Sequence, residues 1–143
     1  MPKTEGFNKV GTSDQRMFGP RKAIVCGFSA SEQPHFMEVL EKGEMLDIPV
    51  VFVTGDRAES RMGDIMELPA GTGLDQDSNL DRAVILSGIS ENELHTLLRT
   101  YRAQGLPAPL WATLTETSVD WPLSELLREL ASEREAFRRT SGK

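Results

Sequence analysis

The chain has 143 residues, a formal net charge of -6 and a single cysteine. This length suits one domain that buries roughly two thirds of its unfolded surface, and one cysteine excludes an internal disulfide framework. No apolar run approaches the length of a membrane span, so we expect a cytoplasmic protein with no membrane partner.

The charge is unevenly distributed along the sequence. Residues 1–22 carry a net charge of +3, residues 23–137 carry -12, and residues 138–143 carry +3. Binding to a nucleic-acid backbone requires clustered Lys and Arg side chains that face the phosphates. An acidic body with short basic ends therefore predicts no specific nucleic-acid partner.

The start of the chain differs in composition from the rest. Residues 1–21 are mostly polar and contain several glycines and prolines, which predicts a flexible N-terminal arm. Within it, Met17 and Phe18 are able to dock on the body or on a second copy. Residues 22–139 are expected to form a single α/β domain of two units, residues 22–68 and 83–137, joined by a linker over residues 69–81.

Four short apolar runs are predicted to be strands, at residues 23–26, 50–54, 83–86 and 110–115. The first three runs are unbroken, which is typical of strands covered on both faces, and each is followed by a helical pattern. This alternation predicts a three-layer α/β fold with a mainly parallel four-stranded sheet. The fourth run is less uniformly apolar, so we expect it at an edge.

Each predicted strand is followed by a predicted helix. The first helix has Pro34 near its start, and the second lies within residues 58–68. The third is the most clearly marked, because Ser90 and Glu93 form a Ser-x-x-Glu capping box and Gly105 provides a stop. The fourth follows Pro122 and continues to residue 137 along a leucine stripe.

The two units follow one plan at a constant spacing of sixty-one residues. Ser29 and Glu32 of the first unit recur as Ser90 and Glu93 of the second, and the strand runs recur with them. This agreement predicts two βαβα units related by internal duplication. The polar segments after the second and fourth strands agree only at their first residue, so we expect any site to be asymmetric and to lie where the copies differ.

Polar residues gather after the predicted strands. In open parallel sheets, ligands bind beside the carboxyl ends of the strands. The candidate ligand-binding residues are therefore Ser29, Thr54, Asp56, Arg57, Ser90, Thr115, Glu116 and Trp121. Helix capping is the alternative role for several of these positions. In this alternative, Ser29 and Ser90 cap the helices that follow them, and Asp56 forms a further capping box with Glu59. The last helix is then capped by Thr117, Ser118 or Asp120.

Other patterns predict no further chemistry. The Asp and Asn residues at alternate positions from 75 to 81 resemble the start of a calcium loop, but Leu86 stands where the bidentate glutamate is required. Neither histidine has a Cys or His partner at ligand spacing. Cys26 is expected to be a small core residue. We therefore expect no metal site, no cofactor and no catalytic residue.

The most distinctive motif of the second unit is the run Trp-Pro-Leu-Ser-Glu-Leu-Leu at residues 121–127, preceded by residues 85–90 and 113–115. With these segments, residues 83–135 resemble a family of short uncharacterised bacterial domains, domain of unknown function 3783. A threonine often follows the tryptophan in that family, and Pro122 departs from this pattern. The resemblance implies an α/β fold, with the first half as a diverged copy, and no established activity.

The sequence contains no convergent set of acid, base and nucleophile. We therefore expect a non-enzymatic binding or regulatory module whose partner is another protein or a second copy in a homodimer. The alternative is a site for a phosphate-bearing metabolite at the carboxyl ends of the strands. A third hypothesis is an enzyme with Asp56 or Glu116 as general base.

Overall fold

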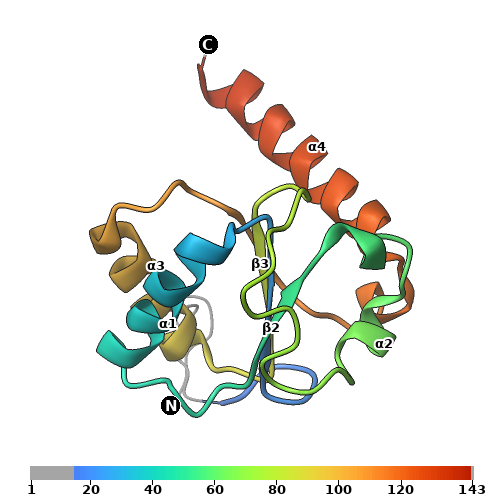
Figure 1. Cartoon of the computed structure of the whole chain (residues 1–143). Helices are drawn as coiled ribbons and strands as arrows, with labels where there is room; N and C mark the ends of the chain where they lie inside the picture. The colour runs from blue at the N-terminus through green and yellow to red at the C-terminus, as the bar shows by residue number, and fades with distance from the viewer. Residues whose placement is uncertain (1–14, 143) are drawn as a thin grey trace.

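The computed structural model describes residues 15–142, with side chains described over residues 15–136. Four strands and four α-helices are formed by the described residues (Figure 1). The strands are β1 Lys22–Cys26, β2 Val50–Val53, β3 Ala83–Ser87 and β4 Leu110–Thr113, and the helices are α1 Gln33–Lys42, α2 Met62–Ile65, α3 Glu91–Gln104 and α4 Leu123–Gly142. Short 3-10 turns precede α1, α2 and α4, at Ala30–Glu32, Gly55–Arg57 and Ser118–Asp120.

The fold has three layers with two apolar cores. Helices α1 and α3 cover one face of the sheet, and α2 and α4 cover the other (Figure 1). Alternate residues of a strand point to opposite faces, so β1 supplies Ala23 and Val25 to the first core and Ile24 and Cys26 to the second. Burial on both faces explains the unbroken apolar runs, and the four-stranded α/β fold is confirmed.

The sheet is mixed, so the prediction of a mainly parallel sheet is wrong. The strand order is β2-β1-β3-β4. Strand β1 is parallel to β2 and β3 is parallel to β4, but β1 and β3 are antiparallel. An unbroken apolar run indicates only that a strand is covered on both faces. It carries no information on how the two βαβ units are oriented, because a layered sheet buries strands of either direction.

Residues sixty-one apart meet at two places in the fold. The β1–β3 ladder pairs Ile24 with Ile85, and a separate antiparallel bridge joins Arg61 to Pro122. Both units also have the same offset between their parallel strands, since residue 23 pairs with 50 and residue 84 with 111. The two units are therefore arranged about a local two-fold axis that passes through the middle of the sheet.

The two edge strands differ in how their outer sides are covered. On β2, the linker lies along the edge: the N–H of Gly71 donates to the carbonyl of Val50, and the N–H of Phe52 donates to the carbonyl of Thr72, both at 2.9 Å. Strand β2 is consequently buried along its whole length. Strand β4 is half-buried from residue 111 to 113, as expected for the least uniform run.

The helix boundaries follow their sequence signals. Ser90 caps α3, and Gly105 ends it in the left-handed conformation at a φ of 81°. A 3-10 turn precedes α1, whose first turn contains Pro34, a residue with no N–H to donate. Helix α4 is longer than the sheet, and its C-terminal part projects beyond the body (Figure 1).

Residues 15–21, the end of the predicted arm, lie beside the end of β3. The N–H of Met17 donates to the carbonyl of Ile89 at 2.8 Å, and the N–H of Gly88 donates to the carbonyl of Phe18 at 3.0 Å. Met17 also packs against the first core, so the predicted docking of this residue is on the body. Residues 1–14 of the predicted arm lie outside the described residues.

Gly27 and Gly88 follow β1 and β3 and share a conformation that L side chains rarely adopt. Their φ angles are 79° and 68°. A Cβ atom at Gly27 would lie 2.6 Å from the backbone of Arg82, and one at Gly88 would lie 2.5 Å from the carbonyl oxygen of Gly19. Gly27 therefore lets the end of β1 approach the residues just before β3, and Gly88 lets the end of β3 approach the residues just before β1.

Alanine at either position should destabilise the fold. Gly105 provides the matched control, because its φ is 81° but no atom lies within 4 Å of the position that a Cβ atom would occupy there. Left-handed strain of about 1–2 kcal/mol is common to all three substitutions. Urea unfolding should give a larger loss of free energy of unfolding for Gly27→Ala and Gly88→Ala than for Gly105→Ala. Equal losses would show that the close approach contributes nothing.

Candidate functional site

The mixed sheet separates the predicted site residues. Because β1 and β2 run opposite to β3 and β4, their carboxyl ends lie at opposite ends of the sheet. The residues that follow the first pair of strands are Ser29, Thr54, Asp56 and Arg57. Those that follow the second pair are Ser90, Thr115 and Glu116. Trp121 lies apart from Ser90, on the α2 and α4 side, where its carbonyl accepts a hydrogen bond from the N–H of Met62.

The two serines act as helix caps. The N–H of Ser90 donates to Glu93 Oε1 at 3.0 Å, and the N–H of Glu93 donates to Ser90 Oγ at 3.1 Å. In the first unit, the N–H of Ser29 donates to Glu32 Oε1 at 3.0 Å. Both predicted capping boxes are thereby confirmed. A phosphate at either serine would have to displace a glutamate from this N–H group.

The other strand-end residues bond mainly to their neighbours in sequence. The N–H of Thr115 donates to Ser118 Oγ, and the N–H of Ser118 donates to Thr115 Oγ1, both at 3.0 Å. The hydroxyl of Thr54 donates to Asp56, and this hydrogen bond lowers the pKa of the Asp56 carboxyl. Glu59 accepts from Ser124 instead of forming a capping box with Asp56. A lowered pKa makes Asp56 a weaker base.

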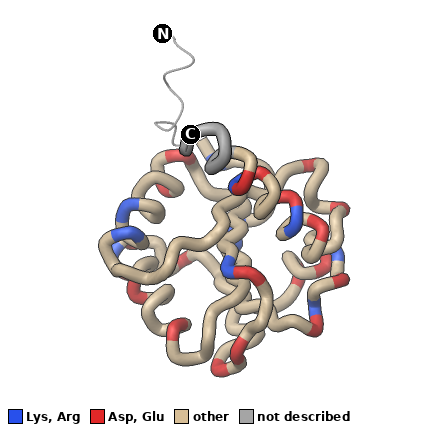
Figure 2. The backbone as a smooth tube through the Cα atoms, turned by 90° about the horizontal axis from the view of Figure 1, so that it is seen from above, with Lys and Arg blue, Asp and Glu red and all other residues tan. Residues whose placement is uncertain are grey.

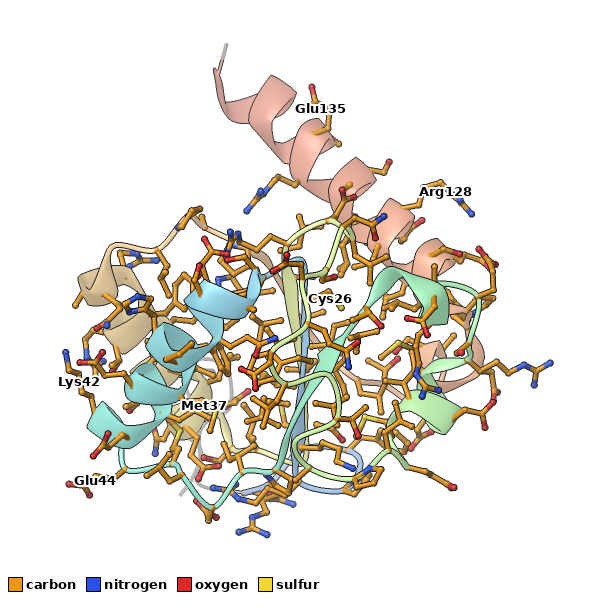
Figure 3. All side chains as sticks on the ribbon, viewed as in Figure 1. Cys26, Met37, Lys42, Glu44, Arg128 and Glu135 are labelled. Atoms are coloured by element: carbon orange, nitrogen blue, oxygen red, sulfur yellow. The ribbon has the colours of Figure 1, made fainter. Side chains whose placement is uncertain are left out.

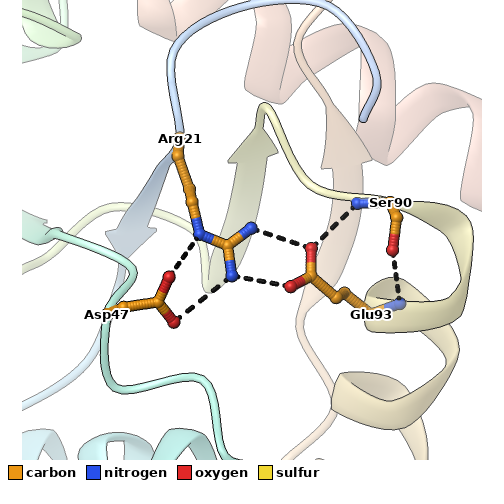
Figure 4. Close-up of polar contacts among 4 residues, drawn as sticks. All are labelled: Arg21, Asp47, Ser90 and Glu93. Carbon is orange, nitrogen blue, oxygen red and sulfur yellow. Dashed lines mark hydrogen bonds and ion pairs between the residues drawn. The ribbon is translucent and has the colours of Figure 1, made fainter. Parts of the chain in front are cut away.

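Two arginines join the halves through the capping glutamates. Arg21, just before β1, donates to both carboxylate oxygens of Glu93 at 2.8 and 2.6 Å and to Asp47 at 2.7 Å (Figure 4). Arg82, just before β3, donates to both oxygens of Glu32 at 2.9 Å. Each arginine binds the glutamate of the other unit, because antiparallel β1 and β3 place the start of one strand beside the end of the other.

The sequence patterns described above do not predict these crossed ion pairs. Arg21 and Arg82 are themselves sixty-one residues apart, so the recurrence could have been extended by one residue to include them. Their partners could not be identified in the same way, because the crossing follows from the antiparallel orientation of the two units. Arg82 also lies against an aromatic ring, since its guanidinium carbon is 4.4 Å from the centre of the Phe28 ring.

Acid should weaken these pairs. Hydrogen bonds from Arg21 lower the pKa of Glu93, and bonds from the Ser29 N–H and from Arg82 lower the pKa of Glu32, below the ordinary value of 4.5. A carboxyl with a lowered folded pKa stabilises the fold above its unfolded pKa and loses this contribution as the pH falls through the folded value. The free energy of unfolding should therefore decrease as the pH falls below 4.5.

The measurement compares the wild type with the double variant Glu32→Gln/Glu93→Gln by urea unfolding, from neutral pH to about pH 3. The variant should lose about 1–3 kcal/mol per site at neutral pH, because hydrogen bonds to a charged group are the stronger ones. Its stability should depend less on acid than that of the wild type. The same pH dependence in both proteins would rule out these carboxylates as the cause.

A groove beside α1 is a concave feature that the sequence did not predict. It consists of two adjoining hollows of about 540 and 440 Å³ that share Met37, Leu46 and Leu74. Met37 lies on α1 (Figure 3), Leu46 lies in the connection to β2, and Leu74 lies in the linker. Leu46 is 54% exposed and Leu74 is 49% exposed. We call this feature the α1 groove.

The linker wall of the α1 groove is held by one buried side chain. Gln33, on α1, is 2% exposed. Its Nε2 donates to the carbonyls of Gly73 and Gln76 at 3.1 Å, and its Oε1 accepts from the N–H of Asp75 at 2.8 Å. Three hydrogen bonds from one amide thus fix the segment that carries Leu74. The only sequence signal for this wall was an isolated leucine in a polar linker.

Carboxylates surround the apolar surface of the α1 groove. Glu38, Glu41, Asp47 and Asp75 line the two hollows, and the described lining of either hollow includes no lysine or arginine. Asp47 is bound by Arg21, and Glu38 lies 3.4 Å from the Lys42 ammonium. Over the rest of the body, acidic and basic positions are intermingled (Figure 2). The groove is therefore a locally acidic surface with an apolar floor.

Removing the Gln33 amide should loosen the linker wall. Gln33→Ala leaves the N–H of Asp75 and the carbonyl of Gln76 without this partner, while the carbonyl of Gly73 keeps its hydrogen bond from the N–H of Gln76. The cost should be about 1–3 kcal/mol. Amide hydrogen exchange over residues 71–76 should become faster by at least about tenfold. Gln104→Ala is the matched control, since Gln104 donates to Glu38 on the exposed surface. Unchanged exchange in Gln33→Ala would mean that the linker is held by other contacts.

Metal and thiol chemistry find little support in the described part of the chain. Within residues 15–142, no group of three or more His, Cys, Asp or Glu side chains could hold a metal ion. Cys26 lies in the middle of the body (Figure 3), and burial raises the pKa of its thiol to about 12. Cys26 is therefore a core residue, as predicted. None of the described helices combines the length and apolar character that a membrane crossing requires.

Comparison with known proteins finds a family model that matches the second unit. Residues 82–137 match the model of a domain of unknown function, DUF3783. The match runs from the start of β3 into α4, and it confirms the resemblance carried by the motif at residues 121–127. No curated protein and no solved structure matches the chain. The α1 groove is formed by residues 33–75, outside the matched segment.

Proposed function

We propose that the protein is a non-enzymatic binding module whose α1 groove receives an amphipathic, positively charged helix of a partner protein. The observation that carries this proposal is the half exposure of Leu46 and Leu74 over two adjoining hollows. Apolar surface of this kind, surrounded by polar side chains, is typical of protein interaction sites. The site is formed by the first unit and the linker and has no counterpart in the described residues of the matched second unit, in line with the expectation of an asymmetric site.

The covered edge of β2 decides the form of the bound segment. Addition of a strand requires free N–H and C=O groups on the edge, but the carbonyl of Val50 and the N–H of Phe52 already bond to linker residues 71 and 72. A partner at this edge therefore meets side chains and not an open backbone. A helix satisfies its own backbone and offers apolar side chains three and four residues apart, which suits contact with Met37, Leu46 and Leu74.

The negative charge of the α1 groove favours a positively charged partner. The carboxylates of Glu41 and Asp75 border the hollow that contains Leu74, and the chain as a whole carries a net charge of -6. Lysine or arginine residues beside the apolar face of the helix would meet these carboxylates. Such complementarity mainly raises the association rate and the specificity. The acidic groove would repel a phosphate-bearing metabolite.

The rigid linker wall favours binding. Gln33 holds residues 73–76 in place before a partner arrives, so little conformational entropy is lost when the groove is filled. The alternative site at the strand ends lacks comparable support. Seven of its eight candidate residues divide between opposite ends of the sheet, Trp121 lies on the α2 and α4 side, and the N–H groups of Ser29 and Ser90 donate to their own glutamates.

The internal duplication is part of the same proposal. It is supported by the equal strand offsets and by the pairing of residues sixty-one apart. Linker residues 69–81 correspond by this spacing to residues 130–142, which continue α4 instead of crossing a sheet edge. The α1 groove would therefore have arisen where one copy acquired a linker in place of the extended helix.

The test is a selection of helical peptides from a displayed random library, with the protein as target. Binders should share apolar residues at helical spacing with lysine or arginine beside them. The double variant Leu46→Ser/Leu74→Ser should bind the selected peptides at least about tenfold more weakly, a loss of about 1.4 kcal/mol. Both leucines are half exposed, so the variant should still fold.

Phe18→Ser is the matched control, because Phe18 is 40% exposed and is not among the residues that line either hollow. It should leave peptide affinity unchanged. Fluorescence anisotropy with labelled peptides gives the affinities. Selected peptides that are acidic, or that bind the double variant as tightly as the wild type, would refute the proposal.

A further inference from the structure

Strand β4 presents an open edge in the middle of its length. The N–H groups of Leu110 and Leu114 donate to carbonyls of the chain that forms β3, at 2.9 and 2.8 Å. Backbone groups of a strand alternate in direction, so the N–H and C=O groups of Trp111 and Thr113 point away from β3. Strand β4 lies at the end of the described strand order, and no described residue hydrogen-bonds to these outward groups.

The open stretch is bounded on both sides. At its start, the carbonyl of Pro109 accepts a hydrogen bond from Arg134 of α4 at 2.8 Å. Beyond its end, the N–H of Thr115 donates to Ser118 Oγ. The unpaired groups are thus those of Trp111 and Thr113, on either side of Ala112. The other edge of the sheet, at β2, is covered by the linker.

We propose that β4 pairs with β4 of a second copy in antiparallel orientation, about a two-fold axis at Ala112. Antiparallel neighbours exchange both N–H···O=C bonds in alternate pairs. With the axis at Ala112, Trp111 of one copy lies opposite Thr113 of the other, and both residues carry outward N–H and C=O groups. All of the open groups are then used, and the two four-stranded sheets become one.

The side chains at this edge are also self-complementary. Residues directly opposite each other in an antiparallel pair share a face of the sheet. The half-buried Trp111 ring, which contacts Tyr101 at a centroid distance of 5.3 Å, would lie beside Thr113 of the second copy. Aromatic and β-branched residues form favourable cross-strand pairs. The two-fold axis creates this pair twice, and Ala112 leaves room for the close approach at the axis.

The positions of two charged residues favour the same register of the β4–β4 pairing. Pro109, whose carbonyl binds Arg134, lies opposite Thr115 of the second copy in this arrangement. Glu116 follows Thr115 and is exposed. Arg134 of one copy is therefore placed beside Glu116 of the other, at both ends of the shared ladder. The occupant of this edge is a second copy of the chain. In the two-fold arrangement, the residues that leave backbone groups open on one copy provide the matching donors and acceptors on the other.

The dimer would extend the proposed function without depending on it. The α1 groove lies at the β2 edge, and β2 and β4 are opposite edges of the sheet. A joined sheet therefore carries one groove at each distant end. A particle with two equal sites binds a repeated or dimeric partner more tightly than one site alone.

Sedimentation velocity over a concentration series tests the pairing. The wild type should form dimers in a concentration-dependent equilibrium. Thr113→Pro removes an outward N–H but no bond to β3, and proline is accepted on an edge strand. It should raise the dimer dissociation constant at least about tenfold. Thr113→Val keeps the N–H and the branched shape, so it should leave the dissociation constant within about a factor of two.

A charge exchange tests the register and does not rely on proline. Glu116→Arg and Arg134→Glu should each weaken the dimer, and the double variant should restore it, with circular dichroism showing that each variant folds. A wild type that stays monomeric at every concentration would overturn the proposal. A dimer that Thr113→Pro does not weaken, or that the double variant does not restore, would also overturn it.

Discussion

The antiparallel junction between β1 and β3 determines the arrangement of the whole molecule. It places the start of each central strand beside the end of the other, so that Arg21 meets Glu93 and Arg82 meets Glu32. The same glutamates cap the helical segments that follow β1 and β3. In each unit, a single glutamate side chain therefore links the strand junction to the start of a helix. The backbone segments approach so closely there that a glycine is required where each central strand ends.

This junction also determines where a site can lie. Because the two units are antiparallel, the carboxyl ends of the four strands do not meet at one crevice. The polar residues at each end of the sheet are bound mainly to neighbouring residues. The surfaces that remain lie at the two edges of the sheet. One edge has a linker that covers the backbone and builds the α1 groove, and the other has an open backbone. Side-chain recognition suits the first edge and strand pairing suits the second.

Much of the fold was predictable from local signals. Short apolar runs identified the strands, and the Ser-x-x-Glu motif with Gly105 identified α3, because burial and capping depend on residues close in sequence. The direction of β3 relative to β1 was not predictable, since it depends on contacts between distant segments such as Arg21 and Glu93. The α1 groove was hidden for the same reason: Leu46 and Leu74 are isolated leucines in separate connections, and only the fold brings them together.

A double-mutant cycle on the crossed ion pairs tests the account most directly. Arg21→Met combined with Glu93→Gln should show a coupling free energy of about 1–2 kcal/mol in urea unfolding, because the two side chains share two hydrogen bonds. Arg21→Met combined with Glu32→Gln should show a coupling near zero, since Glu32 belongs to the other pair. Coupling of Arg21 to Glu32 instead of Glu93 would mean that the arginine binds within its own unit, and it would contradict the antiparallel junction.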